Sequence, residues 1–399
     1  MSKTVVILGG SFGGLHVAHA LLKKRIKDLK VILVSKVRKL PRLGSRDTPD
    51  RDHMRLTDSQ NSHFFWNIAS VRAIIPGQIK DGDIFKPLES ALSRYPKDSW
   101  ELIIGTAKAA EFDNKTVDVA LSSDNSTRTI AYDQLVLATG SRCSAPTTPW
   151  KAAGSYEEVL NSLHEAVAQV KEAKDIVIAG GGSTGVEVAG ELGYEFGKTK
   201  KITLLCAGDA LLNGDSLAAA AANELRKLNV TVRFGARAQD ARAAPGGKTE
   251  VVLANGGETL VTDLFLPTTG LVPNTDYVPA RYLSADERYP VVLVDEYLRV
   301  QDAEAVWACG DVVSQPRAGF FITQKQAASV ARNVEAALAG REPAVAKGPP
   351  VDIFACAVGR GRGVGRMGSF KLPSFGVWLA KGRTLAVQMV PSYIDGSVA

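Results

Sequence analysis

Two glycine-rich turns, each set between an apolar strand and a helix, limit what this chain can fold into. The first turn lies at the end of residues 5–14 (VVILGGSFGG). Apolar residues at helical spacing follow it up to residue 24. Four successive apolar residues are typical of a strand buried on both faces. Such a turn lets the backbone approach a pyrophosphate, and the helix that follows faces it with free N–H groups and a positive dipole end. Residues 5–14 therefore indicate a dinucleotide-binding turn.

The first turn fits the G-x-G-x-x-G frame with one departure. Gly9 and Gly14 occupy the outer glycine positions, but Ser11 stands at the middle one. A serine adds atoms where the backbone must come close to a phosphate. The turn still predicts a first set of cofactor-binding residues, which are Gly9, Gly10, Ser11, Phe12, Gly13 and Gly14.

A second copy of the motif lies at residues 176–185 (IVIAGGGSTG) and leads into a helical pattern. Gly180, Gly182 and Gly185 fill the frame completely. Two such units in one chain predict two bound dinucleotides. A protein that holds two usually passes electrons between them.

Each unit lacks the acidic residue that normally binds the adenosine ribose. Ser35 lies 21 positions after Gly14, and Cys206 lies 21 positions after Gly185. An acid is the usual residue about 20 positions on. Without an acid in the second unit, no charge repels a 2′-phosphate, yet no arginine follows to bind one. NADH and NADPH are therefore both open.

The chain is long enough for two or three domains, at 399 residues. We expect a first dinucleotide-binding domain built from residues 1–150 and 271–340. Residues 151–270 form the second, and residues 341–399 form a small C-terminal α+β region. The fold class is therefore α/β, with two Rossmann-like domains, the second nested in the first.

Composition excludes several classes of protein. The net charge is +6, but no basic stripe is interleaved with aromatics, so we expect no nucleic-acid partner. No apolar run approaches the roughly 20 residues of a membrane-spanning helix. The cysteines are far apart and form no C-x-x-C, which predicts neither a metal site nor a redox dithiol. We interpret them as reduced thiols in a reducing compartment.

Residues 36–60 differ from the rest of the chain. They hold seven basic and four acidic residues with almost no apolar periodicity. We interpret them as a solvated, mobile insertion. A functional basic patch and an error in the gene model are the alternatives.

The chain resembles the two-dinucleotide-binding flavoprotein reductases. The resemblance rests on the two glycine units, on the strand ends 138–140 (ATG) and 268–270 (TTG), and on Cys309-Gly310-Asp311. Residues 64–72 and 372–375, with Lys381-Gly382-Arg383, resemble the apoptosis-inducing-factor-like branch. That branch includes AMID-like members, the ferroptosis-suppressor type and their fungal homologues.

The resemblance implies a glutathione-reductase-like fold with FAD in the first unit and NAD(P)H in the second. Arg72 would lie beside FAD, and the backbone at Ala107 would contact the adenine. Asp311 would bind the ribityl and pyrophosphate region. Gly140 follows a strand end whose small residues let the chain pass close to the cofactor.

The resemblance also implies two residues that tune the reaction. Glu187 would lie near the nicotinamide, and Lys381 would lie near the flavin and the acceptor. The branch often has an aromatic residue shortly after this lysine, whereas this chain has Leu385-Ala386. The missing ring weakens the case for a flat, ubiquinone-like acceptor.

These observations predict an FAD-dependent NAD(P)H oxidoreductase that reduces a quinone-like or other small-molecule acceptor. The alternatives are a tailoring oxidoreductase of secondary metabolism and a redox-linked effector with incidental turnover. Residues 372–390 mix apolar and basic side chains, which fits either peripheral membrane contact or the core of the third region. We expect a cytoplasmic protein, with a membrane or the mitochondrial surface as alternative locations.

Overall fold

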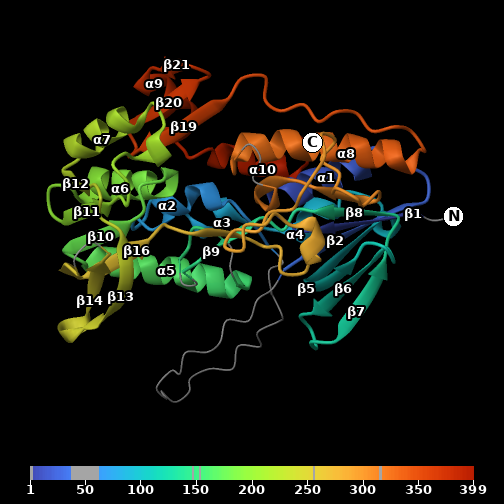
Figure 1. Cartoon of the computed structure of the whole chain (residues 1–399), viewed down its shortest axis with the longest axis horizontal. Helices are drawn as coiled ribbons and strands as arrows, with labels where there is room; N and C mark the ends of the chain where they lie inside the picture. Colours follow the sequence, from blue (N-terminus) through green and yellow to red (C-terminus); the bar gives the residue numbers. More distant parts are fainter. Residues whose placement is uncertain (1–2, 37–62, 146–147, 152–153, 255–256, 314–316) are drawn as a thin grey trace.

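The computed structural model describes residues 3–36, 63–145, 148–151, 154–254, 257–313 and 317–399 (Figure 1). Of the insertion predicted at residues 36–60, all but Lys36 lies outside these described residues.

The first unit is built on a seven-stranded sheet with the order β18-β8-β1-β2-β5-β6-β7. The pairings from β18 to β5 are parallel, and β6 and β7 continue antiparallel. Val5 and Ile7 of β1 enter one hydrophobic core, while Val6 and Leu8 enter another, so this strand is buried on both faces as predicted. The strands are β1 (Lys3–Leu8), β2 (Leu29–Ser35), β5 (Trp100–Glu111), β6 (Thr116–Leu121), β7 (Thr127–Ala131), β8 (Gln134–Leu137) and β18 (Val306–Ala308).

Two helices lie side by side on one face of this sheet (Figure 1). They are α1 (Phe12–Lys23) and α8 (Phe320–Leu338). Short elements between β2 and β5 pack nearby, namely β3 (His63–Phe65), η1 (Asn67–Ala69), α2 (Ser70–Ala73), α3 (Asp81–Ile84), β4 (Phe85–Pro87), α4 (Leu88–Leu92) and η2 (Lys97–Ser99).

The second unit has a four-stranded parallel sheet with the order β12-β11-β10-β16. Its helices are α5 (Tyr156–Glu172), α6 (Ser183–Phe196) and α7 (Ala218–Lys227). A three-stranded antiparallel sheet packs on it through Val251 and Leu253. The strands are β10 (Asp175–Ala179), β11 (Lys201–Leu205), β12 (Val230–Arg233), β13 (Ala238–Ala244), β14 (Lys248–Leu253), β15 (Thr259–Thr262) and β16 (Leu264–Pro267).

The second unit is inserted into the first. Strand β18 follows the second unit in sequence, yet it pairs with β8 of the first sheet. The two connecting segments also pair with each other, as strands β9 (Ser141–Cys143) and β17 (Leu271–Pro273). The predicted α/β fold, with one Rossmann-like unit nested in another, is confirmed.

The last part of the chain adds a small antiparallel sheet and short helices. Strands β19 (Ile353–Val358), β20 (Arg362–Met367) and β21 (Phe370–Leu372) pair in that order. This sheet lies directly on α6, because a Cβ at Gly190 would come within 2.6 Å of the Gly359 nitrogen. The helices are α9 (Ser374–Val377), the π-helix η7 (Trp378–Gly382), η8 (Val387–Met389) and α10 (Val390–Ile394).

The apolar pattern of the sequence predicts one strand over residues 130–137 and a helix that opens at residues 85–88, and both predictions are wrong. Residues 130–137 are not one strand but the end of β7 and all of β8, since β7 pairs antiparallel with β6 and β8 pairs parallel with β1. Asp133 marks the break, where its carboxylate accepts the Thr4 N–H at 2.6 Å. Residues 85–87 do not open a helix but form strand β4, and α4 begins at Leu88. Among the helices in the described ranges, none is both long and apolar enough to cross a bilayer.

Candidate functional site

The first glycine turn joins β1 to α1 and needs glycine at both ends. Gly9 has φ +116°, and a Cβ there would lie 2.2 Å from the Ala138 carbonyl oxygen. A Cβ at Gly14 would lie 1.8 Å from the Gly9 carbonyl oxygen. This tight closure leaves the first N–H groups of α1 without helix partners, at the positive end of the helix dipole. The turn is therefore shaped to hold a pyrophosphate.

The serine at the middle position of this turn causes no conflict. Ser11 is the N-cap of α1, is exposed, and has an extended backbone with φ −101°. Gly182 is the N-cap of α6 in the second turn, and a Cβ there would meet nothing within 4 Å. Because this position opens onto free space in the second copy, a short side chain fits there in the first.

The remaining predicted residues of the first turn pack against protein. A Cβ at Gly10 would lie 2.7 Å from Cδ1 of Leu88, and one at Gly13 would lie 3.1 Å from Sγ of Cys309. These contacts hold the turn in place. The Phe12 side chain enters an aromatic cluster with ring-centroid distances of 5.1–5.6 Å, formed with Phe64, Trp66, Phe320 and Tyr393.

A cavity of about 460 Å³ opens beside Gly9 at the ends of β1 and β2. Cavities of about 300–1,000 Å³ are typical of small-ligand sites. Ala107, predicted to contact adenine, lines this cavity. Sequence reasoning missed Lys36, which also lines it and follows directly after the vacant acid position at Ser35. It also missed three further lining residues, Lys108, Asn274 and Tyr277.

Asp311 is the middle residue of the turn η6 (Gly310–Val312), which begins two residues after the end of β18. Its Oδ2 accepts hydrogen bonds from Ser141 Oγ at 2.6 Å and Lys151 Nζ at 2.8 Å. Burial alone would raise the pKa of Asp311, but the Lys151 charge and the two hydrogen bonds outweigh it and lower that pKa. The carboxylate is therefore ionised and positioned to accept hydroxyl hydrogen bonds. Gly140, with φ +65°, has open space where a Cβ would stand.

The second glycine turn repeats the first in its geometry. Gly180 has φ +128°, and a Cβ there would lie 2.5 Å from Thr268 Oγ1. A Cβ at Gly185 would lie 1.8 Å from the Gly180 carbonyl oxygen. Together with the open position at Gly182, the N-terminus of α6 forms the second pyrophosphate-shaped turn.

Glu187 of α6 and Lys381 of η7 form a partly buried ion pair. Lys381 Nζ lies 2.6 Å from Glu187 Oε1 and donates to the Ala355 carbonyl at 3.1 Å. The same Glu187 oxygen accepts the Ala357 N–H at 3.0 Å. Burial would lower the pKa of Lys381, but the charge of Glu187 and its hydrogen bond to the ammonium outweigh burial and raise that pKa. The structure therefore brings the two predicted tuning residues together.

Arg72 lies in a neighbouring buried pair. Its guanidinium donates to both carboxylate oxygens of Glu191, at 2.7 and 3.0 Å. It also donates to the carbonyls of Gly382 at 2.6 Å and Arg383 at 2.9 Å. The guanidinium thus joins α2, α6 and the segment that carries Lys381, and the position of Arg72 beside the flavin stays a prediction. Glu191 stands one helical turn after Glu187, so both pairs share one face of α6.

The described residues fit the two dinucleotides. The first turn, the cavity at Ala107 and the ionised Asp311 suit FAD, since they supply N–H groups, space and a hydroxyl acceptor. The second turn has the same closure and open N-cap, and thus suits NAD(P)H.

Residues 3–337 match the profile of the pyridine nucleotide-disulphide oxidoreductases. The chain belongs to this family. Its members are NAD(P)H-dependent flavoprotein enzymes that bind FAD, so the predictions of an oxidoreductase and of both cofactors are confirmed. The profile ends before the C-terminal segment that supplies Lys381.

Relatives of full length narrow the placement within the family. The chain is 38% identical to oxidoreductase ptaL of the fungus Pestalotiopsis fici, covering 99% of this chain and 100% of that one. It is 25% identical to human ferroptosis suppressor protein 1, covering 96% and 93%. The predicted relationship to this branch and its fungal homologues is confirmed. A sulfide:quinone oxidoreductase structure from Aquifex aeolicus shares the fold, with a TM-score of 0.73, 15% identity, and coverage of 100% and 93%.

The cysteines do not supply the chemistry of a disulphide reductase. All four are free, and those at 206, 309 and 356 are buried. Burial raises the pKa of the Cys309 thiol to about 12 and that of Cys356 well above its usual value. Disulphide reduction needs a thiolate that attacks and a second thiol that resolves the mixed disulphide. The four cysteines are free and form no pair, so they provide neither.

Proposed function

We propose that this NAD(P)H-dependent flavoprotein reduces a small organic acceptor with a quinone-like carbonyl, beside the Glu187–Lys381 pair. The observation that carries the proposal is this pair, a buried carboxylate holding a lysine at 2.6 Å where the second unit meets the C-terminal sheet. A cation held in that way can donate a hydrogen bond to an oxygen that gains negative charge.

Each residue has a separate part in the proposed reaction. When bound, FAD supplies hydride-accepting chemistry and NAD(P)H supplies the hydride. The raised pKa of Lys381 keeps its ammonium protonated at neutral pH, so Nζ can hydrogen-bond the acceptor oxygen. Glu187 holds that ammonium in place, and the Ala357 N–H fixes the carboxylate. Asp311 and Lys151 orient the cofactor chain by hydrogen bonding.

Stopped-flow kinetics on the Lys381→Met variant test this function. Under anaerobic conditions, flavin reduction by NADH or NADPH should keep its rate within about threefold. Reoxidation by a soluble quinone should slow by about 10²-fold, the typical effect of one lost electrostatic donor. The matched control is Lys371→Met, because Lys371 is exposed on β21. Equal reoxidation rates in wild type and Lys381→Met would contradict the proposal.

A tailoring enzyme that acts on a secondary metabolite is the second candidate. Two observations favour it, namely the full-length match to a fungal oxidoreductase and Ala386 in place of an aromatic residue. In this case quinones reoxidise the flavin slowly, and a fungal carbonyl or phenolic metabolite reoxidises it quickly. If a nucleotide reduces the flavin but no acceptor reoxidises it, that result would favour an effector role instead.

We also propose that the C-terminal sheet rests on a membrane surface from the cytoplasmic side. Phe370 is 80% exposed, Phe375 is 69% exposed and Leu379 is 54% exposed. Phe375 and Leu379 stand one helical turn apart, and Lys371 is exposed on the preceding strand β21. Aromatic and basic residues on one face are typical of interfacial segments. This placement would give an apolar acceptor a short path to Lys381.

A further inference from the structure

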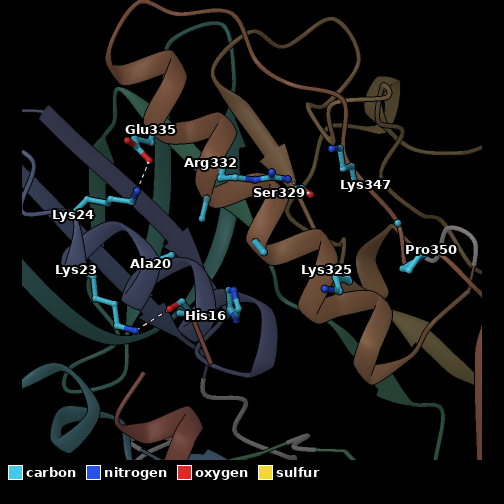
Figure 2. Close-up of a pocket in the computed structure, with 14 residues that line it drawn as sticks. His16, Ala20, Lys23, Lys24, Lys325, Ser329, Arg332, Glu335, Lys347 and Pro350 are labelled. Carbon is cyan, nitrogen blue, oxygen red and sulfur yellow. Dashed lines mark hydrogen bonds and ion pairs between the residues drawn. The ribbon is translucent and has the colours of Figure 1, made fainter. Parts of the chain in front are cut away.

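A second cavity lies between α1 and α8, formed by residues different from those of both glycine turns. It has a volume of about 660 Å³, within the roughly 300–1,000 Å³ of small-ligand sites. Figure 2 shows it between the two helices, which face each other across it. From α1, His16, Ala20 and Lys23 line it at the four- and three-residue spacing that puts side chains on one helix face.

The α8 wall has the same regular spacing. Lys325, Ser329 and Arg332 follow one another at three- and four-residue steps, with Ala328 and Ala331 between them. Ser329 and Ala331 are buried, whereas Lys325 and Arg332 are exposed. The cavity therefore has an apolar floor and a cationic rim.

Positive charge on this rim is largely uncompensated. Glu335 is the one acidic side chain among the described lining residues, and Lys24 Nζ lies 3.5 Å from it. Lys23 Nζ donates to the oxygen of Ala399, another lining residue, at 2.8 Å. In the part of the chain that the structure describes, Lys325, Arg332 and Lys347 pair with no carboxylate. Arg332 instead donates to Ser329 Oγ at 3.1 Å. The three side chains belong to two separate segments, yet they surround one opening (Figure 2).

A polar atom in the floor has no hydrogen-bond partner among the described residues. Nδ1 of His16 is buried without one, and only 3% of the residue is exposed. Burial and the charge of Lys23 lower the pKa of His16 to about 4, so its ring is neutral near pH 7. A neutral ring adds no charge to the floor, so the positive charge of the cavity lies at its rim.

We propose that this cavity binds an amphipathic organic anion, with its carboxylate at Lys325, Arg332 and Lys347 and its apolar body on the alanine floor. Three cations without acidic partners around one opening attract a negative charge, and an apolar floor favours a hydrocarbon over water. A small inorganic anion would leave that floor uncovered. The site is separate from the Glu187–Lys381 pair, so the proposal stands independently of the acceptor.

Calorimetric titration of the FAD-loaded full chain with decanoate tests the proposal. We expect one decanoate per chain, with weaker binding as salt is raised, because the rim charges are exposed. The double variant Lys325→Gln/Lys347→Gln should bind about tenfold more weakly. The control Lys171→Gln/Lys198→Gln removes the same charge from exposed sites on the second unit and should bind within about twofold of wild type.

Two further probes separate the parts of the claim. Acetate tests the carboxylate alone, and 1-decanol tests the apolar body alone, and both should bind at least about tenfold more weakly than decanoate. An Ala328→Trp variant, which fills the floor, should abolish binding while flavin content and melting temperature stay unchanged. Equal binding of 1-decanol, equal binding of acetate, no decanoate binding, or an unchanged affinity in the double variant would each overturn the proposal.

Discussion

Lys381 Nζ lies 2.6 Å from Oε1 of Glu187, which joins the C-terminal segment to the second glycine unit. Neither residue belongs to a glycine motif turn, and the lysine lies beyond the part of the chain that the family profile covers. The pair therefore connects the general dinucleotide fold to a segment that is specific to this branch.

Replacing the acid of this pair should change the pH dependence of turnover. In wild type, the charge of Glu187 outweighs burial and raises the pKa of Lys381, so acceptor turnover should stay level up to about pH 9. In the Glu187→Gln variant the charge that raises the pKa of Lys381 is gone, and burial then lowers this pKa. Turnover of the variant should therefore fall at a lower pH than in wild type. Parallel pH profiles for the two proteins would contradict the tuning role.

Removing the neighbouring arginine should destabilise the protein strongly. Glu191 has only 1% of its side chain exposed, and Arg72→Met would leave that carboxylate without its bidentate partner. Breaking a buried pair from one side typically costs about 3–5 kcal/mol. Urea unfolding followed by tryptophan fluorescence measures the loss.

Two companion variants make this stability test specific. The double variant Arg72→Met/Glu191→Met should recover most of the stability, since no buried charge then lacks a partner. Lys201→Met breaks the exposed pair with Asp175 and should cost less than about 1 kcal/mol. A mild effect of Arg72→Met would show that the buried pair is not important for stability.

The two glycine turns should tolerate change at different positions. Gly182→Ser should fold and keep nucleotide-driven flavin reduction, because a Cβ there meets nothing within 4 Å. Gly185→Ala should abolish this reduction, because its Cβ would lie 1.8 Å from the Gly180 carbonyl oxygen. Soluble yield and stopped-flow reduction rates check both variants, and similar behaviour of the two would contradict the geometric argument.

Asp311→Asn should remove a component of stability that depends on pH. The lowered pKa of Asp311 means that its pair with Lys151 stabilises the fold above the ordinary aspartate pKa of about 3.9. This contribution is lost as the pH falls through the lowered value. Wild type should therefore exceed the variant in unfolding free energy at about pH 6, and the gap should narrow at about pH 3. Asp113→Asn, in an exposed pair with Arg281, should show no such gap.

Membrane binding should depend on the exposed rings of the C-terminal sheet. Phe375→Ser/Leu379→Ser should reduce flotation with anionic liposomes several-fold, because both side chains are largely exposed. Phe321→Ser is the control, since Phe321 is half exposed but lies on α8. Equal flotation of wild type and both variants would contradict the proposed contact between the C-terminal sheet and a membrane.

The features that could be predicted from the sequence are those formed within a few neighbouring residues. Both glycine turns could be predicted because the steric need for glycine at Gly9 and Gly180 arises within a few residues. The nested fold could be predicted because a buried strand with a polar end, which ends at Ala308, follows the second unit in sequence. That strand pairs with β8 of the first sheet.

Tertiary relationships were harder to predict. The partner of Arg72 could not be derived, since Glu191 meets it only after α2 and α6 pack together. Lys36 and Tyr277 line one cavity from distant parts of the chain, and no local pattern marks them. The cavity between α1 and α8 also depends on two helices far apart in sequence.

The absorption spectrum of the purified protein, recorded before and after anaerobic addition of NADH and then NADPH, tests the central claim most directly. The account predicts the two visible bands of bound flavin and their bleaching by at least one of the nucleotides. A colourless protein that takes up no added FAD, or a bound flavin that neither nucleotide bleaches, would contradict it.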